Sequence, residues 1–585
     1  METDEFILVC SALSPIRCWC LLMIAASPMI STETITAFQS DSFVESIGVN
    51  THWAFTGVYS NNYATLRNKL GESGIRYVRD GTFSDVFTRA NDLYNSFGIK
   101  TNMLTGRWIP GYWPAPLDPT QIDAELNDIK TLALQTVAAI EAPNEYDHSH
   151  GPDADWVSTI RNYSMLLYNK VKADPLLKNF SVIGPSFGKF ETYHAVGSLE
   201  SYIDYGNQHM YYWTYWPGFS GFDSNESYSI DWFLNTLAPE QSPSRKPIQA
   251  TETGHTTFTE LGGISEEADG KYTLRILAEF FRRGIYRTYK YELVDQALPD
   301  REGFFGLLRN NLTEKPSFRA VKNLISILND KGSSFAPNVL TYTLTGNLTN
   351  VRQLLFQKRN DDFYLMIWNE VSSWDVAHKL DLYPLPQQLQ LSLQSDYILA
   401  NATLYTFNNN ADLQTINLSI NSNQVNFNAT DTVSIIRLKN GTNSSSGTST
   451  TAGTEIGGVY RITPKYAPQS GLYAIGDQNY AFVSQSQYSG STNQQWTVES
   501  LIDGYYRIKN RAGTRVLNVY GCNPNDRGKF ELLSNGYYRI TPKHALNQSL
   551  DVQMCTTVGG IIVQQWSWSN SECQQWKLEK IALAV

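Results

Sequence analysis

The feature that most constrains the fold is an alternation of short apolar segments with helical patterns, repeated eight times between residues 46 and 330. The strand candidates are 46–51, 75–79, 99–104, 136–140, 180–184, 206–211, 248–251 and 286–291, and the helical candidates include 118–134, 153–172, 272–283 and 317–329. In 153–172, apolar side chains recur at steps of three and four residues, as one buried helix face requires. Eight β/α units in this length predict a (β/α)8 TIM barrel, assigned to 32–330.

An open, doubly wound sheet is the alternative to the closed barrel. Such a sheet usually binds its ligand at a glycine-rich turn after one of its strands. No glycine-rich phosphate loop follows any of the strand candidates in this chain. The closed barrel is therefore the preferred prediction.

Two strand candidates of the barrel end in a glutamate. Segment 136–140 leads into the sequence Glu-Ala-Pro-Asn-Glu, which ends at Glu145, and segment 248–251 is followed by Glu252. Because the carboxyl ends of all strands of a parallel barrel open at one face, we expect these two carboxylates to meet across a pocket. Two carboxylates that flank one sugar are what retaining glycoside hydrolysis requires.

Other acidic residues also lie near strand ends. We expect Glu141 to point into the barrel below Glu145 and to be a hydrogen-bonded, buried network residue. Glu292, after the eighth strand candidate, and Glu260, beyond Glu252, are alternatives for a catalytic role. No His, Cys and Asp residues have metal-ligand spacing, and no Ser, His and Asp order stands out. We therefore expect no metal site, no cofactor and no serine hydrolase.

The glutamates at the ends of the fourth and seventh strand candidates resemble the pattern of clan A glycoside hydrolases, the retaining 4/7 superfamily. The resemblance covers roughly half of the chain. It implies that Glu145 is the acid/base, that Asn144 binds the sugar 2-hydroxyl and that Glu252 is the nucleophile. Tyr146 follows Glu145 where many members of the clan have proline.

Four further positions match the clan. By resemblance, Arg79 would keep the nucleophile ionised, and His209 and Tyr211 would contact the same carboxylate. Tyr291, at the end of the eighth strand candidate, would form the floor of the sugar site. Arg79 could instead be an ordinary salt-bridge partner inside the barrel, and His209 a hydrogen-bonded core histidine.

The chemistry sets electrostatic and geometric expectations for this pair. Arg79 and Tyr211 should lower the pKa of Glu252, whereas burial and the charge of Glu252 should raise the pKa of Glu145. For retention the two carboxyl groups should stand about 5–5.5 Å apart, whereas inversion needs roughly 6.5–9.5 Å.

Composition agrees with a carbohydrate partner. Charged residues make up 17% of the chain and aromatic residues 13%, including 14 Trp and 34 Tyr, and the net charge of −10 argues against a nucleic acid partner. His52 and Trp53 follow the first strand candidate and are candidates to line the sugar pocket. The loops after the third and sixth strand candidates carry more possible stacking platforms: Trp108, Trp113, Trp213 and Trp216.

After the barrel the pattern changes to short alternating strands separated by Asn, Asp and Pro turns. The candidates are 351–357, 364–368, 390–393, 404–407 and 433–438. They predict an antiparallel β-sandwich over 331–439, which also includes the N-terminal region 34–43. Residues 440–456, rich in Gly, Ser and Thr, are expected to form a flexible linker.

An internal repeat fills 457–585. Three units open with closely similar sequences at Gly458, Gly504 and Gly536, and the first and third close on Gln-Gln-Trp. This pattern resembles a ricin-type β-trefoil lectin, whose units bury their core only together. The resemblance implies a glycan ligand for this domain.

Only the third unit has the residues for a lectin site. Asp551, Gln564 and Trp566 have lectin-like spacing, and Gln574, from the closing motif of the same unit, is assigned to the same sugar site. The first unit has Tyr473 at the position of Asp551, and the second has Asn518 there and lacks the closing motif. Cys555 and Cys573 are the expected disulfide inside the third unit, which leaves Cys522 unpaired.

Residues 1–31 are expected to be a targeting segment. Arg17 precedes the apolar run 18–26, which is too short to span a bilayer, so a cleaved signal peptide is favoured over a membrane anchor. Sequons are frequent: Asn162, Asn179, Asn225, Asn311, Asn347, Asn401, Asn417, Asn428 and Asn547. We expect a secreted, extracellular glycoprotein with no membrane segment after cleavage.

Together these patterns predict a secreted retaining β-glycoside hydrolase that acts on a β-linked glycan by double displacement, with a lectin module that anchors it to carbohydrate. The expected substrate is a polysaccharide or oligosaccharide. One alternative is a lectin with an inactive barrel, and another is a structural or adhesive glycoprotein.

Overall fold

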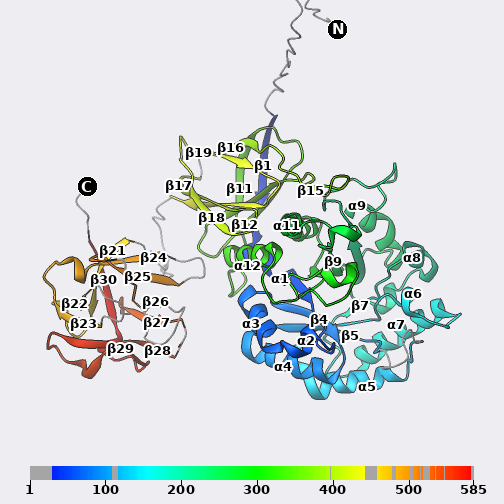
Figure 1. Ribbon diagram of the computed structural model, residues 1–585, viewed down its shortest axis with the longest axis horizontal. Helices are drawn as coiled ribbons and strands as arrows, with labels where there is room; N and C mark the ends of the chain where they lie inside the picture. Colours follow the sequence, from blue (N-terminus) through cyan, green and yellow to red (C-terminus); the bar gives the residue numbers. More distant parts are fainter. Residues whose placement is uncertain are drawn as a thin grey trace, which may run out of the picture.

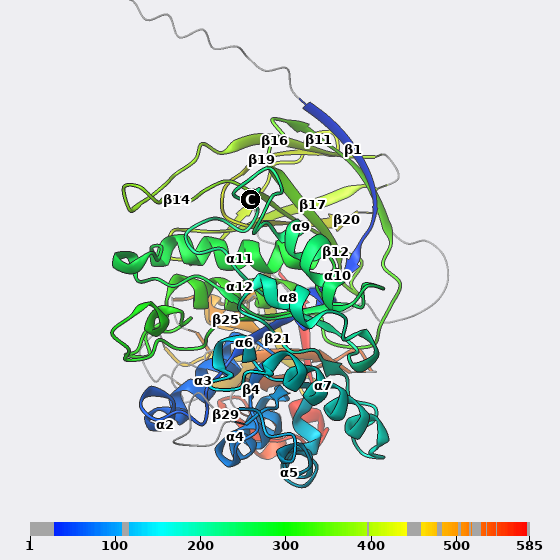
Figure 2. The ribbon, with the colours of Figure 1, turned by 90° about the vertical axis from the view of Figure 1, so that its right-hand side faces the viewer.

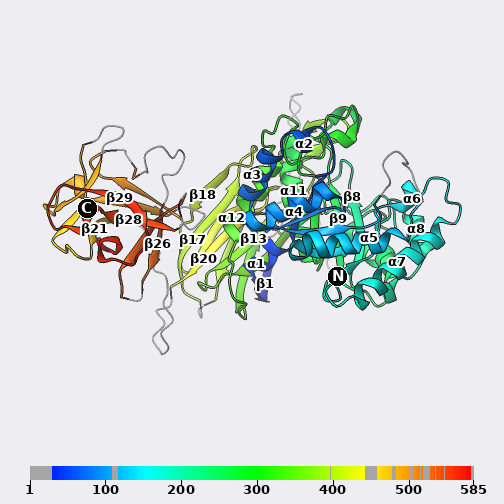
Figure 3. The same ribbon diagram turned by 90° about the horizontal axis from the view of Figure 1, so that it is seen from below.

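The computed structural model describes residues 29–107, 116–394, 397–441, 458–476, 482–500, 505–513, 516–517, 528–533, 535–543, 545 and 547–581. The chain forms a parallel barrel, an antiparallel sandwich and a β-trefoil (Figure 1). The view from below shows the sandwich between the barrel and the trefoil (Figure 3). The predicted combination of a (β/α)8 barrel, a β-sandwich and a β-trefoil is confirmed.

The barrel has eight parallel strands, each matching one strand candidate of the sequence. They are β3 (Ile47–Asn50), β4 (Tyr77–Gly81), β5 (Lys100–Leu104), β6 (Val137–Glu141), β7 (Val182–Ile183), β8 (Gly206–Tyr211), β9 (Ile248–Gly254) and β10 (Arg287–Lys290). Ile183 of β7 bridges to Tyr205, just before β8, in parallel orientation. This contact closes the sheet, so the open-sheet alternative is excluded.

Helices cover the outside of the barrel. They are α2 (Val58–Asn61), α3 (Tyr63–Ser73), α4 (Ser84–Phe97), α5 (Gln121–Asp128), α6 (Tyr146–Ser149), α7 (Trp156–Ala173), α8 (Phe190–Val196), α9 (Ile230–Trp232), α10 (Ala238–Gln241), α11 (Glu266–Arg282) and α12 (Pro316–Leu328). In α7 the predicted apolar face is the buried one, with Ile160, Tyr163, Leu167 and Val171 inside. The periodicity of the sequence therefore sets how this helix docks on the barrel.

The sandwich consists of two sheets. One has the order β1 (Met29–Thr36), β11 (Val339–Gly346), β16 (Gln387–Leu393), β19 (Gln424–Ala429). The other has the order β18 (Leu413–Asn417), β17 (Leu399–Phe407), β20 (Ser434–Asn440), β13 (Phe363–Asn369), β12 (Val351–Gln357), β2 (Phe38–Gln39), and a hairpin is formed by β14 (Trp374–Asp375) and β15 (Leu380–Asp381). Leu340, Tyr342 and Leu344 alternate toward the core, as a half-buried strand requires.

The N-terminal strands belong to the sandwich. β1 pairs antiparallel with β11, and β2 pairs parallel with β12. Residues 29–31, predicted to belong to the signal peptide, therefore lie in β1, and the sandwich takes up the first residues that were assigned to the barrel. Residues 40–43 lie in the short helix α1 (Ser40–Glu45).

The barrel and the sandwich share one hydrophobic core. Phe43 of α1, Phe281 of α11 and Phe356 of β12 form a ring cluster with centroids 5.1 to 5.8 Å apart. Beside it, fully buried Arg275 of α11 lies 3.4 Å from fully buried Glu370, directly after β13. The view in Figure 2 shows α11 and α12 between the sandwich and the barrel strands. The sandwich is thus packed on the barrel as one body.

The trefoil combines a closed barrel with a capping sheet. The barrel consists of β21 (Gly458–Pro464), β24 (Trp496–Ser500), β25 (Tyr506–Asn510), β26 (Gly528–Leu532), β27 (Tyr538–Pro542) and β30 (Trp576–Lys580), and the cap of β22 (Ser470–Ala474), β23 (Val483–Gln487), β28 (Gln548–Val552) and β29 (Ile561–Ser567). The indole N–H of Trp496 donates to the carbonyl of Leu472, and that of Trp576 to the carbonyl of Leu550. The closing motifs of units one and three therefore have the same core role.

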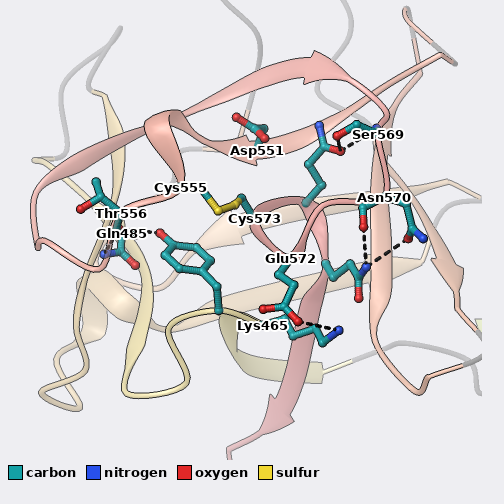
Figure 4. Close-up of a disulfide and its surroundings, with 12 residues drawn as sticks. Lys465, Gln485, Asp551, Cys555, Thr556, Ser569, Asn570, Glu572 and Cys573 are labelled. Carbon is teal, nitrogen blue, oxygen red and sulfur yellow. Dashed lines mark hydrogen bonds and ion pairs between the residues drawn. A yellow bond between two sulfur atoms is a disulfide. The ribbon is translucent and has the colours of Figure 1, made fainter.

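Cys555 and Cys573 form a disulfide, the pairing expected from the sequence (Figure 4). Its Cα atoms are 5.4 Å apart, and it ties the turn after β28 to the turn before β30. The predictions for Cys522, Asn518, Trp108, Trp113, most of the signal peptide and most of the linker fall outside the described residues. Among the residues that are described, no helix combines the length and apolarity needed to cross a bilayer.

Candidate active site

The mouth of the barrel collects the predicted polar side chains from four strands. Arg79 is on β4, Asn144 and Glu145 follow β6, and His209 and Tyr211 end β8. In the sheet register His209 stands directly beside Glu252 of β9. The structure therefore brings the two candidate carboxylates to one face, as the strand assignment predicted.

Arg79 is the centre of a buried ionic network. Its guanidinium donates to Glu252 Oε1 at 2.7 Å, to Glu141 Oε1 at 2.8 Å and to Asn144 Oδ1 at 2.6 Å. Burial lowers the pKa of Arg79, but the charges of Glu141 and Glu252 outweigh it and raise the pKa above the ordinary arginine value. Arg79 was interpreted either as a salt-bridge partner inside the barrel or as the cation beside the nucleophile. Both interpretations hold, because one guanidinium pairs with Glu141 and with Glu252.

Glu141 has the structural role expected for it. It is fully buried, and besides Arg79 it accepts hydrogen bonds from Asn207 at 3.0 Å, from Thr251 at 2.9 Å and from Asn102. A buried carboxylate with this many donors is satisfied and has no access to a ligand. It fixes Arg79 from below, so that the guanidinium faces Glu252.

Both carboxylate oxygens of Glu252 are held by donors. Arg79 binds Oε1, and the hydroxyl of Tyr211 donates to Oε2 at 2.8 Å. The side chain of Glu252 is 12% exposed, so it is largely enclosed but open to the mouth. These two donors fix the orientation of the carboxylate at the barrel mouth.

Glu145 sits on a strained turn. Its φ of 39° is left-handed, a conformation that costs free energy for a residue other than glycine, and it directly precedes α6. The backbone N–H of Glu145 donates to the carbonyl of Ser186 at 3.1 Å. Its side chain is 28% exposed, more than that of Glu252. The turn therefore lifts the carboxyl group toward the open mouth.

The partner of Glu145 differs from the prediction. His209 Nδ1 lies 2.7 Å from Glu145 Oε1 and 3.7 Å from Glu252 Oε2, so its closer contact is the acid/base candidate and not the nucleophile. Burial raises the pKa of Glu145, but the hydrogen bond and charge of His209 outweigh it, and the pKa lies below its usual value. The prediction of a raised pKa for Glu145 is wrong in the unliganded site, because a cation stands beside it.

Both ring nitrogens of His209 lie at hydrogen-bond distance from an oxygen atom. Nε2 lies 3.0 Å from the hydroxyl of Thr251, whose own proton goes to Glu141 or Asn207. Burial lowers the pKa of His209, but the charge of Glu252 and the bond to Glu145 outweigh it and raise the pKa above its usual value. The raised pKa of His209 and the lowered pKa of Glu145 both favour an imidazolium beside a carboxylate.

The two candidate catalytic groups are close together. One carboxylate oxygen of Glu145, one of Glu252 and a ring nitrogen of His209 all lie within 4.8 Å of one another. An approach this close between two carboxylate oxygens is compatible with the carboxyl separation of about 5–5.5 Å that retention requires. Within the described part of the chain, these side chains form the one group close enough to hold a metal ion. Arg79 and the protonated form of His209 already place positive charge beside these carboxylates. This charge disfavours a metal cation between Glu145 and Glu252.

Asn144 is oriented by its neighbours. Its Oδ1 accepts from Arg79 at 2.6 Å and from the hydroxyl of Ser186 at 3.3 Å, which turns the amide nitrogen the other way. Sequence reasoning missed Ser186 and Gly188, both after β7. A Cβ at Gly188 would lie 3.4 Å from the Glu145 carboxyl carbon and 2.4 Å from the His148 ring. The Gly-Pro-Ser-Phe-Gly sequence after the fifth strand was the available signal.

The predicted aromatic residues near strand ends divide into two groups. Tyr291 and His52 pack together with ring centroids 5.5 Å apart, and burial lowers the pKa of His52 to about 4, so this imidazole is neutral at neutral pH. Trp53 is 1% exposed and packs edge-on against Tyr59 and Tyr63. The prediction that Trp53 lines the sugar pocket is wrong, because its side chain points into the core between barrel and helices.

The rival carboxylates lack the setting of a catalytic pair. Glu292 is fully buried, accepts from the hydroxyl of Tyr59 at 2.8 Å and has a pKa raised to about 8 by burial. Glu260 is 74% exposed and pairs with Lys379 at 3.4 Å. One more carboxylate was missed: Glu302, in the short helix Arg301–Phe304 after β10, is electrostatically linked to both Glu145 and Glu252.

The candidate lectin site lies on the β28–β29 hairpin. Asp551 pairs in register with Gln564, whose side chain donates to Asp551 Oδ1 at 3.0 Å, and Trp566 on the same strand is 60% exposed. In Figure 4 Asp551 lies above the disulfide. The three side chains share one face of the hairpin. Asp551 and Gln564 stand opposite each other on paired strands, and Trp566 lies two residues after Gln564.

Gln574 has a different role from the one predicted. It is fully buried, and its Oε1 accepts from the backbone and hydroxyl of Ser569 at 2.9 and 3.1 Å. Gln494 of the first unit makes the same two bonds to Ser489. Since the repeat keeps this arrangement where the lectin residues are missing, Gln574 orders the turn near Asp551 and does not contact a sugar.

Comparison with known proteins agrees with this division of the chain. The family model for ricin-type beta-trefoil lectin domain-like proteins matches residues 450–532 and 526–583. The C-terminal region is a ricin-type β-trefoil domain. This domain is a minority of the chain, so the match does not assign the barrel. No curated protein matches the chain.

Three solved structures show distant likeness. A family 39 glycoside hydrolase from Bacteroides cellulosilyticus WH2 is 14% identical, with a TM-score of 0.49 over 69% of this chain and 82% of the other. A monomeric beta-xylosidase from Caulobacter crescentus CB15 is 14% identical, with a TM-score of 0.47 over 70% and 98%. The designed protein ThreeFoil is 27% identical, with a TM-score of 0.20 over 21% and 99%. These likenesses are too distant to assign an activity, which must come from the site.

We expect Glu141→Gln to lower the free energy of unfolding by about 3 kcal/mol, because it leaves buried Arg79 with one charged partner instead of two. Urea denaturation of the full chain measures the change. Glu260→Gln, the same substitution at an exposed carboxylate, should cost less than about 0.5 kcal/mol. Equal stability of the two variants would show that Glu141 does not hold Arg79 in place.

Proposed function

We propose that the barrel is a retaining glycoside hydrolase that cleaves a β-linked glycan by double displacement, with Glu252 as nucleophile and Glu145 as acid/base. The observation that carries the proposal is that these two carboxylates meet within 4.8 Å while having different partners. Glu252 is held by a cation and a hydroxyl, whereas Glu145 shares a proton with His209. Such a division of partners separates the roles of two carboxylates.

In the first step an oxygen of Glu252 attacks the anomeric carbon and forms an ester, while the bond to the leaving oxygen breaks. Glu145 gives its proton to that oxygen, so the leaving group departs as a neutral hydroxyl compound. In the second step Glu145 takes a proton from water, and the resulting hydroxide displaces Glu252. The free amide nitrogen of Asn144 is available to the sugar 2-hydroxyl near Glu252.

The proton for this step rests on His209 in the free enzyme. The 2.7 Å hydrogen bond to Glu145 lets it pass from Nδ1 to Oε1 when the sugar displaces water and the leaving oxygen develops charge. The pair thus carries one transferable proton, and its titration belongs to both residues. Arg79 and Tyr211 stay with Glu252 and stabilise it when it leaves the sugar again.

The role of Glu145 predicts a dependence on the leaving group. With Glu145→Gln, kcat/KM should fall by about 10²–10⁴-fold for an alkyl β-glycoside but far less for a 2,4-dinitrophenyl β-glycoside, which needs no protonation. Glu252→Gln should abolish hydrolysis of both, and Glu260→Gln should change neither. Steady-state kinetics on a panel of sugars measures this. An equal loss on both leaving groups in Glu145→Gln would contradict the assignment.

The shared proton predicts a pH effect. Because the pKa of His209 is raised, the alkaline limb of kcat/KM should lie above the ordinary histidine value of about 6.5. In His209→Asn the proton must come from Glu145 alone, so the limb should move to lower pH. His194→Asn, an 86% exposed histidine, is the control. A limb that does not move in His209→Asn would show that the proton is not shared.

We also propose that the trefoil binds a glycan through Asp551, Gln564 and Trp566. An acceptor beside an exposed indole is the combination that a sugar with vicinal hydroxyls and an apolar face needs. The alternative function, a lectin with an inactive barrel, remains distinct from this proposal, because it predicts binding without hydrolysis.

We expect Asp551→Ala to remove binding of the full chain to immobilised β-glycans and to leave hydrolysis of a soluble dinitrophenyl glycoside unchanged. The mutated carboxylate lies in the trefoil, away from the barrel mouth. Affinity electrophoresis and a parallel rate assay measure the two effects. Undiminished binding in Asp551→Ala would place the sugar site elsewhere.

Finally, we propose that the chain is a secreted glycoprotein. The apolar run 18–26 and the sequons support this, and cleavage at or before residue 28 would leave β1 complete.

A further inference from the structure

The segment 212–229 carries an exposed aromatic surface from the end of β8. Tyr211, the last residue of β8, holds Glu252, and Trp213 follows two residues later. Trp213 is 37% exposed and has a φ of 51°. A left-handed backbone at a bulky residue is strained, so the surrounding structure must hold it. This backbone conformation presents an indole ring to solvent two residues beyond Tyr211, whose hydroxyl holds Glu252.

Trp213 is part of a continuous surface. Its ring lies 4.9 Å from Tyr228 and 6.1 Å from Phe222, which is 49% exposed. We call Trp213, Phe222 and Tyr228 the aromatic platform. Phe190 of α8, which follows β7, packs 4.5 Å from Tyr228. The platform therefore joins the loops after β7 and β8.

The position of these loops decides which part of a substrate the platform can meet. In the barrel order, β7 and β8 lie between β6, which leads to Glu145, and β9, which carries Glu252. The other arc of the mouth holds His52, Arg79 and Tyr291. The arc of β7 and β8 thus borders both carboxylates. Because Tyr291 on the other arc is assigned to the sugar that Glu252 attacks, we expect the leaving group on the arc of β7 and β8.

We propose that the aromatic platform binds the leaving-group sugar by stacking, so that the substrate is an oligosaccharide or polysaccharide and not a glycoside of a small aglycone. The inference rests on the proposed glycosidase function. The apolar face of a sugar ring matches an exposed aromatic ring, and the three platform side chains are all aromatic.

The sandwich fixes the segment that carries the platform. Glu370, directly after β13, accepts from the backbone N–H of Gly218 at 3.1 Å, and a Cβ at Gly218 would lie 2.2 Å from its Cγ. Glu370 is in turn held by the indole of Trp368 at 2.6 Å and by Arg275. Glu370 is thus a positioning residue, which links the sandwich to the rim of the active site.

Two more contacts fix the same segment. Trp216 packs on a small core that includes Trp374 of the sandwich and Tyr272 of α11. His255, three residues after Glu252, has its Nε2 2.8 Å from the carbonyl of Tyr215. The segment is therefore tied both to the sandwich and to the strand of the nucleophile, so the platform and the reacting carboxylate keep a fixed relation.

The test compares substrates with and without a leaving-group sugar. The probes are xylohexaose, cellohexaose and laminarihexaose, against the β-fluorides of xylose and glucose, whose leaving fluoride cannot reach the platform. Trp213→Ala should lower kcat/KM on the hexaose that the enzyme cleaves by about tenfold, the value of one aromatic contact, and on the fluoride by less than about twofold. Trp213→Phe should recover most of the loss.

Tyr286→Ala removes a 48% exposed aromatic ring at the amino end of β10 and is the matched control. Glu370→Gln and Gly218→Ala should each raise KM for the hexaose and leave kcat on the fluoride unchanged. If Glu370→Gln does not fold, Gly218→Ala tests the same contact, because it keeps the ion pair between Arg275 and Glu370 intact. In a background that carries Glu252→Gln and Asp551→Ala, so that the trefoil site is also removed, the hexaose should quench tryptophan fluorescence, and Trp213→Phe should remove that quench.

Equal losses of kcat/KM on the hexaose and the fluoride in Trp213→Ala would overturn this inference but not the proposed function. An unchanged fluorescence quench in Trp213→Phe would do the same. A wild-type chain that cleaves none of the hexaoses and none of the fluorides would overturn the proposed function, and the inference with it.

Discussion

The site depends on one buried guanidinium. Arg79 lies between Glu141 and Glu252 and also touches Asn144, so it links β4 to β6 and β9. Arg79 pairs with Glu141 and Glu252, and His209 lies against Glu145. A buried charge is tolerated only when it is paired and hydrogen-bonded. The hydrogen-bonding capacity of Glu141 is therefore taken up inside the barrel. Glu145 and Glu252 are left facing the pocket.

This arrangement explains why the strand ends carry these residue types. Glu141 accepts from four side chains and cannot bind a ligand, whereas Glu145, four residues on, is raised by a strained turn. Glu252 remains in its strand and is oriented by Tyr211 and Arg79. The same short stretch after β6 thus supplies both a structural anchor and a reactive group.

Much of this was predictable from the sequence. Apolar runs bounded by turn residues gave all eight barrel strands, and the glutamates at the ends of the fourth and seventh could be placed at one mouth from topology alone. The trefoil and its disulfide followed from the repeat. The contacts of His209 were not predictable, because whether a side chain on β8 turns to β6 or to β9 depends on barrel geometry. Trp53 was misplaced because it points away from its sequence neighbour His52. Gln574 was misassigned because its buried role shows only in the folded turn.

The central claim is that Glu252 attacks the sugar directly, with Glu145 on the other side of the scissile bond. It is tested most directly by proton NMR of the first product released from a β-glycoside that the wild-type chain cleaves. The account predicts that the β-anomer appears first and then mutarotates. Initial appearance of the α-anomer would mean a single displacement by water and would contradict it.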